Sequence, residues 1–266
     1  RDRLITSVCE RKSVLKRPYA ADHSMDNGKE QVMVANVDYV FIVSSLNDNY
    51  NFNRIARYVS VTLQGNSIPV VILTKSDLCS NPGRYASEIE ELSDKVSVHC
   101  VSALYGIGTE ELNKYLQPGK TIAILGSSGV GKSTLVNALV QEDVMKTSEI
   151  RESDAKGRHT TTHRQMIVLL NGARIIDTPG MRELGMCDTD QGIDDTFPDI
   201  AELESCCKFS NCRHETEPGC AIRAAIVDGT LAQDRYELYR SLHEESRHAA
   251  KMKDISKWRK QLKKQR

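Results

Sequence analysis

The 266-residue chain has no long apolar run, no net charge and no internal repeat. None of its apolar stretches approaches the roughly 20 residues that a membrane-spanning helix needs. Its start lacks the charged-then-apolar pattern of a secretory signal, and no low-complexity segment is evident. These absences argue against a membrane-spanning protein. They favour a soluble, cytoplasmic protein of a reducing compartment, which we expect to be a monomer.

The lack of net charge, with 36 basic and 36 acidic residues, would argue against a nucleic-acid partner only if the charges were evenly spread. Residues 188–204 carry seven acids and no Lys or Arg, whereas residues 251–266 carry eight basic side chains and one acid. Within this basic end an apolar residue recurs every three or four positions, at Met252, Ile255, Trp258 and Leu262. The pattern predicts a basic helix with a narrow apolar stripe. Such a helix either docks its stripe on the protein and presents its cations to phosphates, or stays solvated without a partner.

A glycine-rich segment matches the pattern of a phosphate-binding loop. It consists of Gly126, Ser127, Ser128, Gly129, Val130, Gly131, Lys132, Ser133 and Thr134. An apolar run typical of a buried parallel strand precedes it, and a run with helical spacing follows it. We therefore expect backbone N–H groups and a helix N-terminus to bind phosphate oxygens, Lys132 to reach the outer phosphates and Ser133 to ligate Mg²⁺. A glycine turn with an exposed lysine is the alternative.

A second phosphate-side motif, DTPG, comes at the end of another apolar strand. Its Asp177 is where a nucleotide hydrolase holds magnesium, usually through water, and the Gly180 N–H would contact the γ-phosphate. Alone this signal is weak, because an Asp at the end of a strand is often only a helix cap.

Two motifs upstream of the glycine-rich loop predict that the base is guanine. In TKSD, which contains Thr74, Lys75 and Asp77, the carboxylate can accept both N–H groups of guanine's Watson–Crick edge while the lysine stem packs over the ring. Adenine offers an acceptor at that edge, so the ionised carboxylate of Asp77 would repel it. A further strand ends in Ser102 and Ala103, whose small side chains and backbone N–H suit guanine O6. Because TKSD has Thr where the commoner NKxD has Asn, a surface turn would explain it equally well without the other motifs.

The base-reading motifs TKSD and SAL precede GSSGVGKST and DTPG in the chain, which inverts the usual order. In this order, with HTTT between the last two, the sequence resembles the circularly permuted GTPases of the ribosome small-subunit biogenesis family, RsgA or YjeQ. The resemblance spans nearly the whole chain. It implies a late assembly factor that binds the small (30S) subunit and its rRNA and hydrolyses GTP to GDP and phosphate, with turnover stimulated by the subunit. Circular permutation leaves the nucleotide site intact, because the contacts with the nucleotide come from loops at one edge of the sheet, whatever the order of the strands in the chain.

The polar residues 146–165 have no apolar period and are expected to form a switch loop. Thr161 or Thr162 is the candidate to cap Mg²⁺ and sense the γ-phosphate. Met181 stands where Ras-like enzymes carry the glutamine that orients the attacking water, and a thioether cannot do so. By carry-over from the family's histidine before its threonine run, His159 is the catalytic candidate, because an imidazole can hold a water or accept its proton. An exposed loop histidine with no role is the alternative.

Near the end of the chain, C-x4-C-x-H-x5-C offers three thiolates and one imidazole from Cys207, Cys212, His214 and Cys220. This is the ligand set of a closed, four-coordinate structural zinc site, so we expect one stabilising ion, zinc in preference to iron, that takes no part in catalysis. The resemblance implies the same four ligands, and the adjacent Cys206 is therefore passed over. Unpaired thiols and a disulfide framework are the alternatives. The other cysteines look like scattered core or surface thiols: Cys9, Cys79, Cys100 and Cys187.

Together these patterns predict an α/β fold in three parts. Strands are expected over residues 34–46, 68–73, 96–104, 121–125 and 173–177. Residues 36–187 would form a circularly permuted phosphate-loop GTPase domain with a parallel-rich sheet, and residues 188–266 a helical zinc-binding domain with a basic tail. Residues 1–35 do not fit the GTPase. Because they are too few for the family's five-stranded OB-fold, we expect a partial OB-fold-like β segment there.

Two other functions compete with a GTP-hydrolysing assembly factor. One is a nucleotide-gated RNA-binding switch in which hydrolysis is incidental, because Met181 leaves the attacking water unpositioned. The other is a small-molecule or protein kinase, which would share the phosphate loop but would leave TKSD and SAL unexplained.

Overall fold

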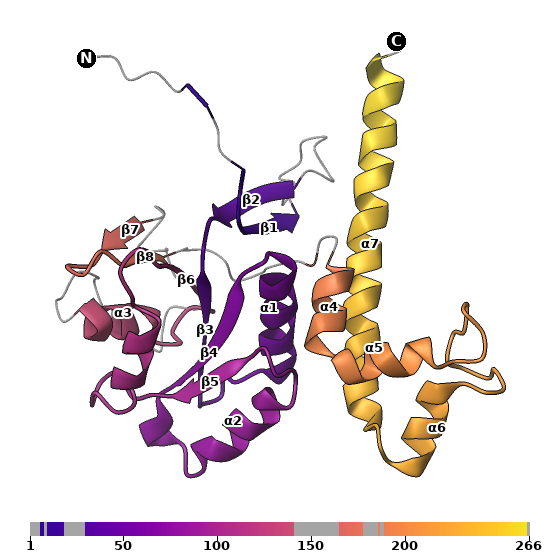
Figure 1. Ribbon diagram of the computed structural model, residues 1–266, viewed down its shortest axis with the longest axis horizontal. Helices are drawn as coiled ribbons and strands as arrows, with labels where there is room; N and C mark the ends of the chain where they lie inside the picture. Colours follow the sequence, from indigo (N-terminus) through magenta and orange to yellow (C-terminus); the bar gives the residue numbers. More distant parts are fainter. Residues whose placement is uncertain are drawn as a thin grey trace.

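A six-stranded sheet forms the centre of the computed structural model, which describes residues 6–7, 10–18, 30–140, 165–177, 186 and 189–264. Across the sheet the strands are β5 (Ser97–Cys100), β4 (Ile68–Thr74), β3 (Tyr39–Ser45), β6 (Thr121–Leu125), β8 (Arg174–Asp177) and β7 (Gln165–Val168) (Figure 1). Neighbours are parallel except β7 and β8, which form an antiparallel pair at one edge. A mostly parallel sheet with helices between its strands confirms the predicted α/β class.

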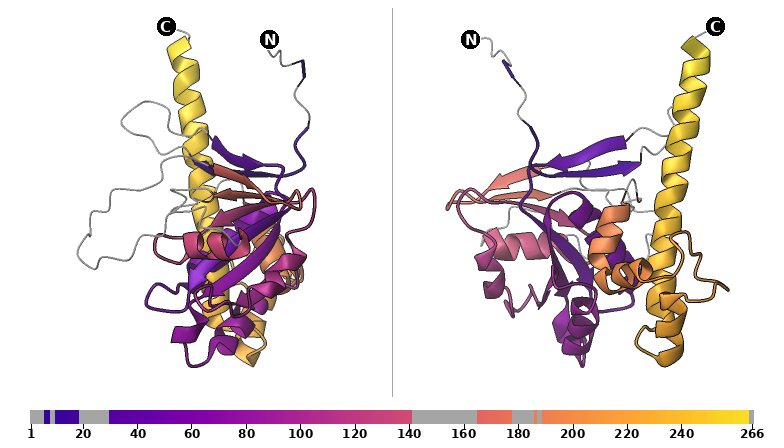
Figure 2. Two further views of the ribbon diagram at one scale, coloured as in Figure 1. Left: turned by 90° about the vertical axis from the view of Figure 1, so that its left-hand side faces the viewer. Right: turned by 45° about the vertical axis from the view of Figure 1, so that its right-hand side comes forward.

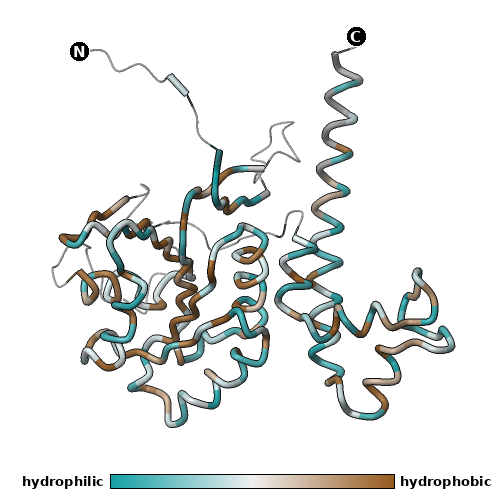
Figure 3. The backbone as a smooth tube through the Cα atoms, viewed as in Figure 1, coloured by the Kyte–Doolittle hydropathy of each residue, from teal (hydrophilic) through white to brown (hydrophobic). Residues whose placement is uncertain are grey.

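The central strands are buried on both faces, which explains why their sequences are continuous apolar runs. Every residue after the first is buried in both β4 and β6. Figure 3 shows this hydrophobic colouring along the middle of the sheet. The strands predicted over residues 68–73 and 121–125 are confirmed. The strand predicted over residues 96–104 ends at Cys100, because the chain then enters a tight loop closed by backbone pairing of Ser102 with Ile107.

Helices cover both faces of the sheet. α1 (Phe52–Gln64) and α2 (Pro82–Glu90) pack on one face, while α3 (Lys132–Val140) and the short 3-10 helix η2 (Glu110–Lys114) pack on the other. Asparagine side chains cap the first pair: Asn51 Oδ1 accepts from Arg54 N at 2.8 Å, and Asn81 Oδ1 accepts from Arg84 N at 3.3 Å. α3 begins at Lys132, so the glycine-rich loop opens onto a helix N-terminus as predicted.

The N-terminal part is a two-stranded antiparallel sheet of β1 (Val14–Pro18) and β2 (Glu30–Ala35). The single strand predicted over residues 34–46 is wrong, because the chain breaks at Asn36, whose φ of 59° is left-handed. Lys12 N donates to the Asn36 side chain at 3.0 Å and holds the turn. Asp38 then accepts from Thr121 N at 2.9 Å, which fixes the start of β3 against β6. The β character of the segment is confirmed, and its assignment to an OB-fold stays a prediction.

In the described part of the chain, four helices follow the sheet: α4 (Asp190–Thr196), α5 (Pro198–Ser205), α6 (Ala221–Asp228) and α7 (Gln233–Lys264). α4 lies so close to α1 that a Cβ on Gly192 would be 2.1 Å from Ser60 O. Gly192 N donates to Gln64 Oε1 at 2.9 Å, and the hydroxyls of Ser60 and Thr196 are 2.9 Å apart. Apolar side chains of α4 to α7 belong to the same core cluster as those of α1 and α2, so this helical part packs directly on the sheet's helical layer.

α7 is one continuous helix of 32 residues. Its first half packs on the core through Tyr236, Tyr239 and Leu242, whereas its C-terminal end extends away from the rest of the molecule (Figures 1 and 2). Met252 and Trp258 are 40% and 61% exposed, so at these two positions the apolar stripe is solvated and not docked on the protein. Among the described residues, no helix combines the length and the apolar character needed to cross a membrane.

Candidate functional site

The predicted nucleotide motifs meet at one edge of the sheet, where the parallel strands end. β6 runs into the glycine-rich loop, β4 ends at Thr74 and β8 ends at Asp177. The strand register places Thr74 beside Ser45 of β3 and Asp177 beside Ile124 of β6. Motifs that are far apart in the sequence are thus gathered around the strand that enters the loop.

The loop has the backbone conformation of a phosphate cradle. Gly126, Gly129 and Gly131 have φ values of 156°, 77° and 90°, in a region that L side chains rarely adopt. A Cβ on Gly126 would also lie 2.4 Å from Val43 O, so glycine is needed there for space. Lys132 Nζ donates to the carbonyls of Gly126 at 2.9 Å and of Ser127 at 2.6 Å, which ties the ammonium to the start of the loop.

Thr74 joins the base-reading motif to this loop. Its side chain is buried, and Oγ1 donates to Val130 O at 2.6 Å. The bond accounts for the departure from NKxD, because a hydroxyl, like the amide of Asn, supplies a donor to the loop backbone. A short side chain suffices because Thr74 ends a buried strand next to the loop.

The remaining base-site candidates lie on two loops and are Lys75, Asp77, Ser102 and Ala103. Ser76 N donates to Val101 O at 3.2 Å, which holds the two loops together. Lys75 has a left-handed φ of 57°, and the 3-10 helix η1 (Ser76–Leu78) that follows carries Asp77 exposed. Ser102 is only 1% exposed, and its hydroxyl has no hydrogen-bond partner within the described part of the chain. A buried polar group of this kind is expected where a ligand binds.

Asp177 is 6% exposed at the end of β8, and Ser133 lies in the first turn of α3. A carboxylate and a hydroxyl are the hard oxygen donors that magnesium prefers; Asp177 ends the strand next to β6, and Ser133 lies in the helix that follows the loop. The two residues therefore fit the predicted Mg²⁺ site. The other phosphate-side and catalytic candidates lie outside the described residues: His159, Thr161, Thr162, Gly180 and also Met181.

Two polar residues that the sequence did not single out also belong to this site. Asn49, in the turn after β3, and Arg54, in the first turn of α1, both contact the side chain of Ser127. The available signal was the asparagine-rich segment 47–54 at the carboxyl end of a predicted strand. That position is where ligand-binding loops of parallel sheets lie.

A second cluster lies in the loop between α5 and α6, where the four predicted metal ligands come together. The ligand atoms of Cys207, Cys212, His214 and Cys220 all lie within 4.8 Å of one another. His214 Nδ1 is 3.6 Å from Cys207 Sγ and 3.4 Å from Cys220 Sγ. A tetrahedral zinc ion with its usual bond lengths separates such S and N atoms by about 3.5 Å. The donor set and the spacing therefore fit zinc.

The thiols of this cluster would ionise only on binding a cation. Burial raises the pKa of the Cys212 thiol to about 11, and the neighbouring thiols of Cys220 and Cys207 add to the rise. A thiol with this pKa stays neutral at pH 7 unless a cation stabilises its thiolate. Cys206 is exposed and stands outside the cluster, as the sequence predicts. Of the scattered thiols, Cys79 and Cys100 are partly buried, and Cys9 and Cys187 lie outside the described residues.

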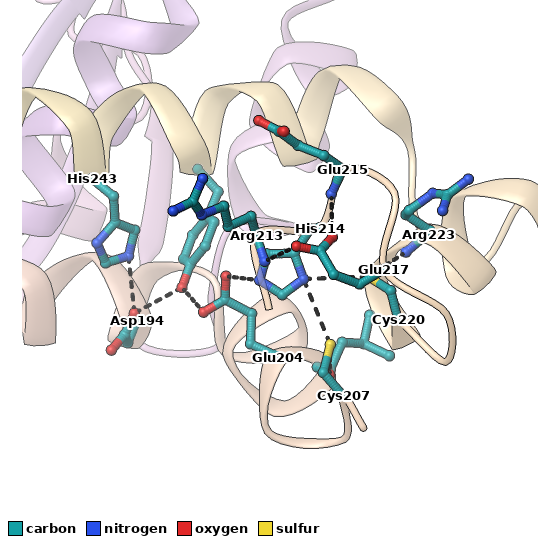
Figure 4. A network of polar contacts seen from close by, with 12 residues as sticks. Asp194, Glu204, Cys207, Arg213, His214, Glu215, Glu217, Cys220, Arg223 and His243 are labelled. Carbon is teal, nitrogen blue, oxygen red and sulfur yellow. Dashed lines mark hydrogen bonds and ion pairs between the residues drawn. The ribbon is translucent and has the colours of Figure 1, made fainter. Parts of the chain in front are cut away.

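The loop that carries the ligands is shaped by one carboxylate. Glu217 accepts from the backbone N–H groups of Arg213 and Glu215, both at 3.0 Å, and of Thr216 at 3.1 Å (Figure 4). These hydrogen bonds, first that from Arg213, lower the pKa of Glu217 to about 2. The loop backbone is thus folded around an anion that is ionised at neutral pH.

A polar network connects His214, one of the four predicted metal ligands, to α4 and α7 (Figure 4). His214 Nε2 is 3.2 Å from Glu204 Oε1, which fixes the ring so that Nδ1 faces the sulfurs. The Tyr239 hydroxyl is 3.0 Å from Glu204 Oε2 and 3.1 Å from Asp194 Oδ1, and His243 Nε2 is 3.1 Å from the same Asp194 oxygen. Several acids of residues 188–204 therefore hold the helical part together.

Comparison with known proteins supports one family. The family model described as RsgA GTPase matches residues 8–187. A small ribosomal subunit biogenesis GTPase RsgA 2 from Listeria monocytogenes is 44% identical over 250 residues, which are 94% of this chain and 70% of that protein. A small ribosomal subunit biogenesis GTPase RsgA from Methanosarcina acetivorans is 42% identical over 253 residues, or 95% of this chain and 68% of that protein.

Two solved structures share the fold. The crystal structure of YjeQ from Thermotoga maritima superposes with a TM-score of 0.63 at 29% identity, covering 90% of this chain and 77% of that one. The crystal structure of YloQ, described as a circularly permuted GTPase, gives a TM-score of 0.57 at 22% identity, covering 91% and 83%. The inverted motif order of this chain is thus found on a known permuted fold.

Proposed function

The chain belongs to the RsgA GTPase family and is a GTP hydrolase, and we propose that it acts as a late maturation factor of the small ribosomal subunit, binding rRNA. Its relatives from Listeria monocytogenes and Methanosarcina acetivorans bear the name of small ribosomal subunit biogenesis GTPases. In this proposal the GTP-bound form holds the subunit, turnover is stimulated there, and hydrolysis releases the protein.

The observation that carries the proposal is the hydrogen bond from Thr74 to Val130 O, because it couples a guanine-reading motif to a phosphate loop. Residues that read the base and residues that hold the phosphates are then one site, although TKSD comes first in the chain. An ATP-dependent kinase would share the phosphate loop but would leave TKSD unexplained.

Roles in the nucleotide site follow from residue chemistry. Asp77 would accept from the guanine edge, Lys75 would pack over its ring, and Ser102 with Ala103 would meet O6. The loop residues Gly126 to Thr134 would hold the phosphates, with the Gly180 N–H at the γ-phosphate. Ser133 and Asp177 would hold Mg²⁺, which when bound offsets the charge of the phosphates. Thr161 or Thr162 would sense the γ-phosphate, and His159 would orient the attacking water.

The Cys207, Cys212, His214 and Cys220 cluster would hold one structural zinc ion. With all four positions filled by protein atoms, the ion would stabilise the loop between α5 and α6 and would not take part in hydrolysis. Residues 36–187 would then be the GTPase domain, residues 188–266 the zinc-binding domain, and residues 1–35 a partial OB-fold. The solvated end of α7, with its basic sequence, would contact rRNA phosphates.

GTP turnover tests the proposal when it is measured alone, with purified small subunits and with large subunits as the control. Salt must be matched, because contacts with RNA are salt-sensitive. A large rise confined to small subunits is the expected result. No rise, with GTP still bound tightly, would favour the nucleotide-gated RNA-binding switch with incidental hydrolysis. Preferential use of ATP would instead revive the kinase.

A further inference from the structure

Two side chains outside every nucleotide motif brace the phosphate loop from α1 and the turn before it. Asn49 Nδ2 lies 3.1 Å from Ser127 Oγ, and Arg54 Nη1 lies 3.0 Å from the same oxygen. Arg54 Nη1 also donates to Asn49 Oδ1 at 3.1 Å. The guanidinium, the carboxamide and the hydroxyl thus close a triangle against the second residue of the loop.

The brace acts on the residue that also fixes the loop lysine. Ser127 Oγ accepts hydrogen bonds from Asn49 and Arg54. The carbonyl oxygen of Ser127 accepts from Lys132 Nζ at 2.6 Å. Asn49 Nδ2 is also 3.5 Å from Ser128 O, so the contact extends one residue further along the loop. A shift of Ser127 would therefore move both the loop backbone and the ammonium that is expected to meet the phosphates.

The backbone at both bracing residues is itself held in place. Asn47 Oδ1 accepts from Asn49 N at 3.2 Å and from Ser45 Oγ at 2.7 Å, which forms a tight turn directly after β3. Asn51 caps α1 by accepting from Arg54 N at 2.8 Å. Because these bonds fix the turn and the cap, the backbone loses little further conformational entropy when the side chains of Asn49 and Arg54 engage the loop.

We infer that Arg54, assisted by Asn49, is a positioning residue for GTP: it holds Ser127, and through it the phosphate loop and Lys132, in the geometry that binds the triphosphate. The inference rests on the proposed assignment of residues 126–134 as the phosphate loop. One Arg54 nitrogen uses both of its hydrogens, one to each partner, and the guanidinium adds positive charge beside an anion site. Such support is expected to strengthen phosphate binding, because displacing the loop atoms by even a fraction of an ångström weakens each of their contacts with the phosphates.

The test compares nucleotide affinity and steady-state turnover in matched variants. In Arg54→Ala, we expect the affinities for GTP and GDP each to fall about tenfold, since a hydrogen bond to a charged group is lost. KM should rise while kcat changes less, because the brace acts in every nucleotide-bound state. Arg54→Lys should restore part of the affinity, because an ammonium can reach one of the two partners.

A double-mutant cycle isolates the contact with Ser127. If Arg54 acts through that hydroxyl, Arg54→Ala should cost little affinity in a Ser127→Ala background. Arg57→Ala is the matched control: Arg57 lies one turn along the same helix but pairs with Glu245 of α7 at 2.7 Å. It should leave nucleotide affinity unchanged. Thermal unfolding of each variant shows whether it is folded, and Arg54→Gln replaces Arg54→Ala if the latter is not.

Lys132→Ala separates failure of this inference from failure of the loop assignment. If Lys132→Ala binds GTP like the unmodified protein, the phosphate-loop assignment falls and the inference falls with it. If Lys132→Ala loses GTP while the Arg54 variant binds normally, the loop stands and the inference is overturned. Fully additive losses in the cycle would overturn it as well, because Arg54 would then act elsewhere than on Ser127.

Discussion

At the scale of single residues, Asp77 is the side chain on which base selection is proposed to depend. Its carboxylate is exposed on η1 at the edge of the site. Asp77→Asn replaces one acceptor by a donor that would face a guanine N–H, and it removes the negative charge from the remaining hydrogen bond, so GTP affinity should fall about 100-fold. Xanthosine triphosphate, which carries a carbonyl in place of guanine's exocyclic amine, should gain affinity in the same variant. Competition between the two nucleotides measures both effects, and an unchanged preference for GTP would contradict the role of Asp77.

The residues that sequence could predict are those whose own chemistry is distinctive. Gly126 and Lys132 stand in a spacing that few other structures need, and the four proposed metal ligands are three thiols and one imidazole within one short segment. Asn49 and Arg54 carry no such mark. Their partner, Ser127, becomes visible only once β3 and β6 lie side by side in the sheet.

At the scale of elements, the contact between α1 and α4 leaves no room for a side chain at Gly192. A methyl group there would meet Ser60 O at 2.1 Å and Gln64 Cβ at 2.8 Å. Gly192→Ala should therefore push α4 away and lower the free energy of unfolding by about 1–3 kcal/mol. Gly83→Ala in α2 is the control, because its nearest atom is Asn81 Oδ1 at 3.8 Å and alanine favours helix. Equal melting temperatures for the two variants would contradict the close contact.

The start of β3 supplies a pH-dependent contribution to stability. Burial of Asp38 opposes ionisation, but hydrogen bonds from Thr121 N and Lys120 Nζ outweigh it and lower the pKa of Asp38. Since this pKa lies below the unfolded value of about 3.9, the ionised carboxylate stabilises the fold above that pH, and the contribution is lost as pH falls through the folded pKa.

Chemical denaturation of the protein and of Asp38→Asn, measured at several pH values, checks this account. The difference in unfolding free energy should be largest above about pH 5 and should shrink below about pH 4. A difference that stays constant from neutral pH down to about pH 2 would show that Asp38 does not act through its charge.

Elements were predictable where local pattern and tertiary structure agree. β4 and β6 are apolar because both their faces are buried, and this shows in the sequence. The break at Asn36 was not predicted, because residues 34–46 are mostly apolar and the pairing of β1 with β2, which ends at Ala35, is not visible in the local sequence. The sequence likewise could not decide whether the apolar stripe of α7 docks on the protein, because such a stripe does not reveal whether another surface packs against it.

At the scale of the whole molecule, the metal loop is expected to stabilise the helices around it. Removing zinc with a chelator should free His214 from its sulfur partners and speed amide exchange in α5 and α6, with less effect on β4 and β6. Adjacent cysteines provide the matched pair: Cys207→Ser should lose the metal, whereas Cys206→Ser should keep one ion per chain. Exchange rates that do not change on chelation would contradict a structural role.

The arrangement of the parts suggests how nucleotide state could reach a partner. α1 touches the phosphate loop through Arg54 and touches α7 through Arg57, while α4 lies between α1 and the network that ends at the metal ligands. A change of loop geometry on hydrolysis therefore has a short path to the helical part, whose basic end is the proposed rRNA contact.

In the proposed function, nucleotide state controls attachment of the protein to the small ribosomal subunit. Co-sedimentation of the protein with purified small subunits, in a non-hydrolysable GTP analogue and in GDP at the same salt concentration, tests this control. We expect strong attachment with the analogue and release with GDP, with no such difference on large subunits. Equal attachment in both nucleotides, or none in either, would contradict it.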